Sequence, residues 1–197
     1  RDTNTGEYIR FDDPDVAARF EAYRHEVHDG KLGMHELCEK ESLRLATDVI
    51  EYVSHWITPV GEPRRFDTRF FLARAPSAQI AIQDNHETTE ILWASPRQAL
   101  MQYWAGDILL APPQIMSLSH LSLYQNVDHA LEDAAQRTPP VIQPESFDVE
   151  GMRVICYPGD PRHSVQVRAL PGPSRLHFRN DRFEPEGGLS EFLHGKL

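Results

Sequence analysis

Three arginines, Arg64, Arg65 and Arg69, lie within six positions of one another in a chain that is acidic overall. An arginine guanidinium donates two parallel hydrogen bonds to a phosphate and does not lose its charge. The cluster is therefore a candidate contact for a diphosphate or a 3′-phosphate. A structural role is the alternative, because Asp67 can pair with a neighbouring arginine and fix a strand in its sheet.

The residues around these arginines have the composition of a strand, and a strand turns successive side chains to opposite faces. Alternation predicts one polar face and one largely apolar face. The polar face would carry Arg65, Asp67 and Arg69, and the other would carry Phe66, Thr68 and Phe70.

Other kinds of catalytic chemistry find little support in the sequence. It contains no G-x-S-x-G nucleophile elbow, no phosphate-binding G-x-x-x-x-G-K-[ST] loop and no G-x-G-x-x-G motif. The ten histidines form no H-E-x-x-H pair, and we interpret them as surface and core residues. Cys38 and Cys156 fit no C-x-x-C pattern, so ordinary thiols are expected rather than a disulfide or a metal pair.

An ordered set of motifs surrounds the arginine cluster. W-x-T-P occupies 56–59, R-R-F-D-T-R-F-F occupies 64–71, D-x-x-E occupies 84–87, and W-x-x-P-x-x-A-L occupies 93–100. In this order they resemble the later half of a Nudix hydrolase domain, in the branch that contains coenzyme A and acyl-coenzyme A diphosphatases. The resemblance implies a metal-dependent hydrolase that cleaves a nucleoside diphosphate linked to another moiety.

The Nudix box, G-x5-E-x7-R-E-U-x-E-E-x-G-U with U aliphatic, has no match in the sequence. In the family its glutamates hold the divalent ions, Mg²⁺ or Mn²⁺, that polarise the diphosphate and activate water. The acidic segment 36–41 lacks the Arg-Glu start and the closing glycine of the box. We therefore expect a segment upstream of Arg1 to carry the box, and the chain alone to be catalytically silent.

Asp84, Glu87 and Glu90 are spaced three apart in a segment expected to form a loop. The resemblance implies that one loop carboxylate lies near the metal cluster, where it binds an ion or deprotonates the attacking water. Glu87 corresponds to the glutamate of D-x-x-E and is the candidate catalytic residue and metal ligand. The alternative is a solvated acidic turn.

Two further positions match the family pattern. Trp56 is a candidate substrate-binding residue because its ring can stack on adenine, although a tryptophan in an apolar strand is typically a core residue. Pro112 and Pro113 match a P-P-T-like motif, with Gln114 where threonine is common. That difference weakens any role for a hydroxyl at this position.

The elements that must position these residues follow from apolar periodicity and capping signals. Helices are predicted where a cap or proline precedes an apolar face, over residues 14–30, 34–46, 96–103, 112–123 and from Asn126 or Asp128 to 136. Strands are predicted where β-branched and aromatic residues crowd together, over residues 49–56, 66–73, 80–82 and 88–93. The first two helices would form an insertion ahead of the sheet.

The character of the chain changes after Thr138-Pro139-Pro140. Short strands are predicted between proline and glycine turns, over residues 152–157, 164–170 and 175–178. The segment 189–197 is expected to be a frayed end. We interpret the region as a small β-rich extension.

Composition limits the partners and the compartment. A formal net charge of −10 argues against general affinity for nucleic acid, which requires a surplus of lysine and arginine. No apolar run approaches the roughly 20 residues of a membrane-spanning helix, and the first ten residues have no signal-like apolar core. We expect a cytoplasmic protein that binds a small nucleoside diphosphate conjugate rather than nucleic acid or membrane.

Together these features predict an α+β, Nudix-like fold in which a mixed sheet is flanked by helices. Residues 1–138 would be the C-terminal part of a Nudix-like domain, and residues 139–197 the β-rich extension and tail. The predicted function is hydrolysis of coenzyme A or acyl-coenzyme A by the parent protein. The alternative is a non-catalytic Nudix-like binding or scaffold protein. If sheet strands lie upstream, the open edge of the isolated chain would aggregate or pair with a second copy as a homodimer.

Overall fold

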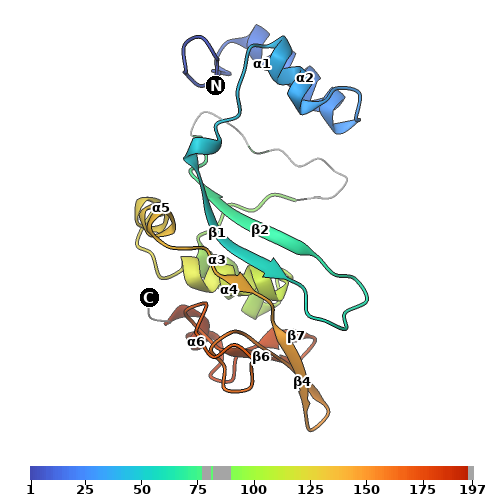
Figure 1. Cartoon of the computed structure of the whole chain (residues 1–197), viewed down its shortest axis with the longest axis vertical. Helices are drawn as coiled ribbons and strands as arrows, with labels where there is room; N and C mark the ends of the chain where they lie inside the picture. Colours follow the sequence, from blue (N-terminus) through green and yellow to red (C-terminus); the bar gives the residue numbers. More distant parts are fainter. Residues whose placement is uncertain (77–80, 82–89, 195–197) are drawn as a thin grey trace. The chain divides into compact units, whose positions relative to one another are not determined.

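The computed structural model describes residues 1–76, 81 and 90–194 of the 197-residue chain (Figure 1). The chain forms two compact units. The first consists of Arg1–Ile50 and Ala73–Ile91, and the second of Glu51–Leu72 and Leu92–Leu197. The domain boundary near residue 138 stays a prediction, and the segments on both sides of it belong to the second unit.

The first unit contains the two helices predicted ahead of the sheet. Helix α1 (Pro14–His28) begins where Asp13 accepts hydrogen bonds from the first-turn N–H groups, and Pro14 occupies the position that needs no N–H. Helix α2 (Met34–Lys40) follows, and then a 3₁₀ turn, η1 (Thr47–Val49). The small core of this unit consists of the buried Tyr23, Leu32 and Leu37 with Phe20 and Val27 against them.

Helix α2 ends six residues before the predicted position at Ala46. Ser42 adopts a left-handed backbone with φ of +52°, which interrupts the helix. The following residues pair with the start of the chain instead, because the N–H of Thr3 donates to Ser42 and that of Arg44 donates to Arg1. This pairing supplies the backbone partners that further helical turns would have used.

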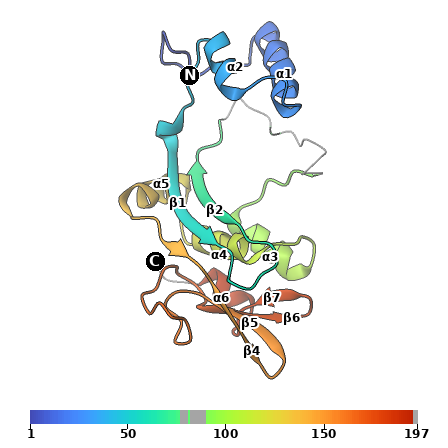
Figure 2. The same cartoon turned by 45° about the vertical axis from the view of Figure 1, so that its right-hand side comes forward.

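The arginine cluster lies next to a three-stranded mixed sheet. Its strands are β1 (Ile50–Ile57), β2 (Asp67–Ala73) and β3 (Val141–Ile142), in the order β2-β1-β3. Strands β1 and β3 are parallel, with Trp56 opposite Ile142. Strands β1 and β2 run in opposite directions (Figure 2). The two strands predicted at 49–56 and 66–73 are thus present, each shifted by one residue at its start.

Three helices follow β2 in the sequence and belong to the second unit. Helix α3 (Pro96–Ala105) begins with a capping box, in which the side chains of Ser95 and Gln98 each bond to the backbone of the other. Helix α4 (Pro112–Leu121) begins at the double proline, and helix α5 (Val127–Gln136) is capped by Asn126. All three were predicted, and their starts agree because cap and proline signals are local.

The C-terminal region forms an antiparallel four-stranded sheet in the order β4-β5-β6-β7. Its strands are β4 (Glu145–Val149), β5 (Met152–Cys156), β6 (Arg175–Arg179) and β7 (Arg182–Glu184). Strands β5 and β6 were predicted. Strands β3, β4 and β7 were not, because each is short or carries several charged residues.

Two predictions for the C-terminal region were wrong. Residues 164–170 form bends and irregular backbone rather than a strand, and the N–H of Gly159 donates to the carbonyl of Val165. The expected frayed end contains helix α6 (Leu189–Leu193), whose Phe192 is fully buried. Burying an aromatic ring stabilises this helix in spite of its short length.

The core of the second unit joins both sheets to the helices. Phe192 packs in it, and Ser119 of α4 donates a hydrogen bond to the carbonyl of Phe192. The core takes buried residues from β1, α3, α4, β3, β5 and β6, namely Trp56, Leu100, Tyr103, Ile115, Met116, Ile142, Ile155 and Leu176, with Tyr157 and Leu170. The region after residue 139 therefore shares one core with the first sheet.

The helices and sheets confirm the α+β class predicted from the sequence. Strands had also been predicted at 80–82 and 88–93. Of these positions the structure describes residue 81 and residues 90–93, and none of them is in a strand. The remaining ones lie outside the described residues. No helix in the described part of the chain is long and apolar enough to cross a membrane.

Candidate functional site

A groove of about 300 Å³ opens in the second unit beside the arginine cluster. Strands β1 and β2, the turn between them and the start of α4 form one wall, and Pro144 with residues of the second sheet forms the other. The lining side chains are Trp56, Ile57, Thr58, Pro59, Glu62, Phe66, Thr68, Phe70, Pro112, Pro113, Pro144, Arg153, Ile155 and Phe183. Most of them are aromatic, aliphatic or proline.

The start of β2 divides its side chains between the groove and the opposite face. Phe66, Thr68 and Phe70 line the groove, as strand alternation predicted. Asp67 and Arg69 face away from it. The arginine motif thus supplies a hydrophobic wall through the residues that stand between the charged ones.

Trp56 contributes to both the core and the groove. Its side chain is 3% exposed, and its ring contacts Phe70 and Tyr157 with centroid distances of 6.4 and 5.9 Å. Its indole N–H donates to the Ser54 hydroxyl at 3.1 Å. Trp56 is therefore a core residue, which is the alternative to a substrate-binding role given by its place in an apolar strand. A role of Trp56 in stacking on a substrate stays a prediction.

Thr58 fixes the turn between β1 and β2. Its hydroxyl accepts a hydrogen bond from the Phe66 N–H at 2.9 Å, and its own N–H donates to the Phe66 carbonyl at the same distance. The Arg65 Nε donates to the Thr58 carbonyl at 3.1 Å. The threonine of the W-x-T-P motif therefore holds Phe66 at the groove and anchors Arg65.

The other two arginines lie in different surroundings. The Arg64 guanidinium stands over the ring of Phe66, 5.3 Å from its centroid, which places a positive charge beside the groove. Arg69 pairs with Asp67 at 3.6 Å, and Asp67 also accepts from His55 Nε2 at 2.6 Å. Asp67 thus pairs with a neighbouring arginine, Arg69, as the structural alternative predicted. Contacts of all three arginines with a ligand stay predictions.

Sequence reasoning missed the wall of the groove that comes after residue 139. Ile155 of β5 and Phe183 of β7 contribute apolar surface, and Arg153 forms an ion pair with Glu62. The Arg153 guanidinium also lies 5.9 Å from the centroid of the Phe183 ring. No local motif marks these residues, because pairing across β5, β6 and β7 brings them together.

The double proline at the start of α4 lines the groove, and Gln114 fixes its geometry. The Gln114 side-chain oxygen accepts a hydrogen bond from the Ala111 N–H at 2.7 Å, which caps the helix. Gln114 therefore caps the helix, although the family motif that this segment resembles has threonine at this position.

Glu87, the candidate catalytic residue and metal ligand, lies outside the described residues, as does Asp84. Within residues 1–76, 81 and 90–194 no three His, Cys, Asp or Glu side chains are grouped so that they could hold a metal ion. We therefore assign no described residue to the Mg²⁺ or Mn²⁺ that the resemblance implies.

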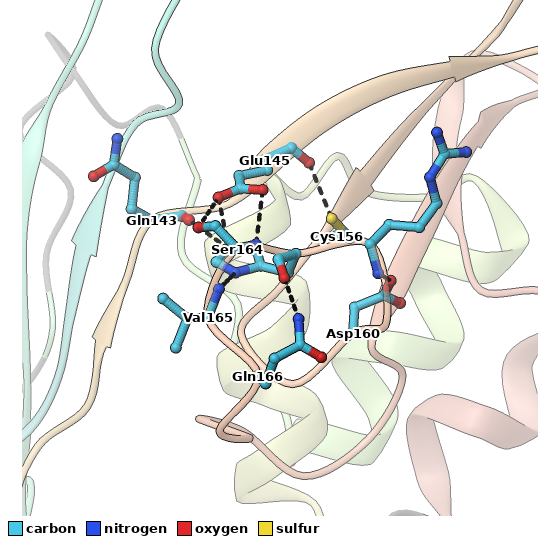
Figure 3. Close-up of polar contacts among 9 residues, drawn as sticks. Gln143, Glu145, Cys156, Asp160, Ser164, Val165 and Gln166 are labelled. Atoms are coloured by element: carbon cyan, nitrogen blue, oxygen red, sulfur yellow. Dashed lines mark hydrogen bonds and ion pairs between the residues drawn. The ribbon is translucent and has the colours of Figure 1, made fainter.

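A polar cluster around Asp160 lies in the loop after β5 (Figure 3). Asp160 is fully buried, and Arg175 donates to both of its carboxylate oxygens at 2.7 and 2.8 Å. The Ser174 hydroxyl and the Arg162 N–H complete its partners at 2.7 and 2.9 Å. Burial alone would raise the pKa of Asp160, but these hydrogen bonds together outweigh burial and lower it.

Glu145 and Ser164 extend this loop network (Figure 3), and His163 bonds within it. His163 Nδ1 accepts from the Val165 N–H at 2.9 Å, so its Nε2 carries the proton and donates to the Gln143 carbonyl at 3.0 Å. Glu145 accepts from the N–H and the hydroxyl of Ser164, and the hydroxyl bond lowers the pKa of Glu145 most. The imidazole and the hydroxyl both bond elsewhere, so the cluster does not form a nucleophile and base pair.

A second, partly buried polar cluster joins α4 to α5 around the buried His120. The Tyr124 hydroxyl donates to Asp133 and lies 2.9 Å from His120 Nε2, while Arg137 pairs with Asp133. Burial lowers the pKa of His120 to about 4, with a further contribution from Arg137. His120 is therefore neutral at pH 7, and we interpret the cluster as structural.

Comparison of the sequence with known proteins places the chain in a family. The family model described as the NUDT19 Nudix domain matches residues 8–121. The acyl-coenzyme A diphosphatase NUDT19 of Gallus gallus is 31% identical over 141 residues, covering 62% of this chain and 36% of the relative. The Homo sapiens protein of the same name is 33% identical over 117 residues, covering 54% and 30%.

A putative nudix hydrolase 7 of Caenorhabditis elegans is 30% identical over 115 residues, covering 58% of this chain and 39% of that protein. The chain thus spans less than half the length of these relatives. The search of solved structures found no match. Because the family model covers more than half of the chain, this chain belongs to the family of the NUDT19 Nudix domain.

Proposed function

We propose that the natural protein carrying this chain is a Nudix hydrolase that cleaves the diphosphate of coenzyme A or an acyl-coenzyme A. The family match over residues 8–121 is the observation that carries the proposal. Two of the relatives are named acyl-coenzyme A diphosphatases. Water attacks one phosphorus of the diphosphate, and the bond from that phosphorus to the bridging oxygen breaks.

The described residues suit the recognition of such a substrate. Arg64 supplies positive charge next to the groove, Arg65 lies in the turn before β2, and Arg69 lies on the opposite face of β2. Guanidinium groups suit the geometry of phosphate oxygens, so all three are proposed to bind phosphate. Arg64 is the strongest candidate, since its guanidinium lies over Phe66 at the groove. Arg65 and Arg69 each form one structural contact and retain further donor N–H groups.

Glu87 remains the proposed catalytic carboxylate on the strength of the D-x-x-E motif. The test uses the natural protein with coenzyme A and Mg²⁺, and separates the adenosine-containing product from the pantetheine-containing product. Removing a general base typically lowers kcat by 10²- to 10⁴-fold. The kcat of Glu87→Gln should therefore be at least about 100-fold lower than that of the unchanged protein. Glu90→Gln is the matched control and should retain activity. Equal activities of the two variants would contradict the role of Glu87.

The same assay tests the proposal that residues 1–197 alone are catalytically silent. We expect the purified chain to release no product above the level of a buffer control. Mg²⁺-dependent hydrolysis that is lost on Glu87→Gln would show that the chain is an enzyme by itself. If the natural protein cleaves no nucleoside diphosphate conjugate either, the binding or scaffold alternative replaces the proposed activity.

A further inference from the structure

The groove has the chemistry of a site for hydrocarbon rather than for phosphate or sugar. The Thr58 hydroxyl bonds to the Phe66 N–H, and Glu62 and Arg153 pair with each other. The other lining groups, apart from the hydroxyl of Thr68, are aromatic rings, prolines and aliphatic side chains. A polar ligand entering this groove would lose hydrogen bonds to water that most of the lining cannot replace.

The groove also combines two parts of the sequence. Its first wall lies within the matched residues 8–121, on β1, β2 and the start of α4. Its second wall, from Pro144 to Phe183, lies beyond the matched residues. The β-rich extension therefore adds an apolar surface to the Nudix domain, which is a direct way to add specificity for a further part of the substrate.

The size of the groove sets the size of the group that it can hold. Its volume is about 300 Å³. A methylene group takes up about as much space as a water molecule, roughly 30 Å³. The groove therefore accommodates a linear chain of about ten carbons, while a longer chain would extend into solvent.

A positive charge lies beside the apolar lining of the groove. Arg64 lies over Phe66, so a ligand with an apolar end against Phe66 and an anionic end near Arg64 would satisfy both. An acyl-coenzyme A carries a hydrocarbon chain at one end and phosphates at the other, and its flexible pantetheine arm can fold back so that the chain contacts Phe66 while a phosphate reaches Arg64. We propose that this groove binds the acyl chain of the substrate and that the β-rich extension forms one of its walls. The inference rests on the proposed function.

The test measures binding, without turnover, to the natural protein in EDTA. The probes are S-alkyl coenzyme A thioethers with chains of two to sixteen carbons, and isothermal titration gives each dissociation constant. Burial of one methylene in an apolar site corresponds to about a fourfold gain in affinity. We expect affinity to rise by up to this factor per carbon and to level off near ten carbons.

Two neighbouring phenylalanines provide a matched pair of variants. Phe66 and Phe71 are 56% and 57% exposed, but Phe66 lines the groove and Phe71 packs against Tyr52 instead. Phe66→Ala should reduce the ratio of S-decyl to S-ethyl affinity at least tenfold. Phe71→Ala should change that ratio less than twofold. Thr68→Phe adds volume on the groove side and should move the levelling point to shorter chains.

The outcomes separate this inference from the proposed function. Affinity that is independent of chain length overturns the inference, even if the protein hydrolyses coenzyme A. A rise with chain length that Phe66→Ala and Phe71→Ala reduce equally also overturns it, because the chain then binds elsewhere. A loss of affinity for free adenosine in Phe66→Ala but not in Phe71→Ala would assign the groove to the base and likewise overturn it. Hydrolysis of coenzyme A, measured separately with Mg²⁺, decides the proposed function.

Discussion

The groove and the Asp160 cluster lie in the same unit. They differ in whether their side chains already have interaction partners within the protein. Around Asp160 the polar groups are buried and paired, and four hydrogen bonds reach its two carboxylate oxygens. In the groove, by contrast, the side chains are apolar and partly open to solvent: Phe66 lines it and is 56% exposed. Catalytic residue types therefore mark a structural cluster here, while unremarkable apolar residues mark the surface available to a ligand.

The comparison explains why residue type alone is a weak guide to function in this chain. Asp160, His163 and Ser164 would attract attention in a search for catalytic residues. Each of them instead fixes the loop between β5 and β6 through its hydrogen bonds, and Figure 3 shows Asp160 and Ser164. A group that already has its partners in the folded protein is not available to a substrate without breaking them.

The largest expected effect is the loss of stability on Asp160→Ala. The change removes a fully buried carboxylate and leaves Arg175 without its partner, although the Arg175 side chain is 29% exposed and can reach water. Removing one member of a buried pair costs about 3 to 5 kcal/mol, and the exposure of Arg175 reduces this to about 2 to 4 kcal/mol. Urea unfolding of the variant measures the free energy of unfolding.

Asp148→Ala is the matched control, because Asp148 lies exposed on β4, in the sheet whose β5 leads into the Asp160 loop. Its free energy of unfolding should change by less than about 0.5 kcal/mol. Equal losses for Asp148→Ala and Asp160→Ala would remove the distinction between the buried cluster and the surface of the sheet.

The next effect is the pH dependence contributed by the buried His120. Its pKa falls from 6.5 to about 4 on folding, because burial disfavours the charged form and Arg137 repels it. Between these values the unfolded chain binds more protons, so stability is lost as the pH falls from about 6.5 toward 4. The loss from this group is about 2 kcal/mol between pH 6.5 and 4.5.

Unfolding measured at a series of pH values checks this contribution. His120→Gln removes the titrating group and should flatten the decline over that range, while Asp133, Arg137 and Tyr124 remain. His129→Gln provides the control, since His129 is exposed on α5. The same slope in His120→Gln as in the unchanged protein would show that His120 does not contribute this pH dependence.

Sequence reasoning predicted the elements whose signals are local. The capped helix starts at Asp13-Pro14 and Ser95-Pro96 agree with the structure, and Asn126 is one of the two caps predicted for the last helix, because each signal acts within one turn. The alternation of Phe66 to Phe70 also holds, because a strand has a period of two. The strand period therefore predicted which side chains share a face, but not that this face lines a groove.

The parts that sequence reasoning missed depend on contacts between distant segments. Strand β7 and helix α6 are short, and they are stabilised by pairing with β6 and by the burial of Phe192. The groove wall at Arg153 and Phe183 exists only after β5, β6 and β7 are in register. A single sequence carries no local pattern for such a register, so the second wall could not be predicted from it.

The smallest expected effect is on stability at the groove itself, and it sharpens the contrast with Asp160. Phe66→Ala and Phe71→Ala each remove a ring that is more than half exposed, so each should change the free energy of unfolding by less than about 1 kcal/mol. Their similar exposure makes the expected costs similar. If Phe66→Ala instead costs as much as Asp160→Ala, Phe66 is a core residue in solution and the groove is closed. If both costs are small, a loss of S-alkyl affinity in Phe66→Ala alone reports on binding and not on folding.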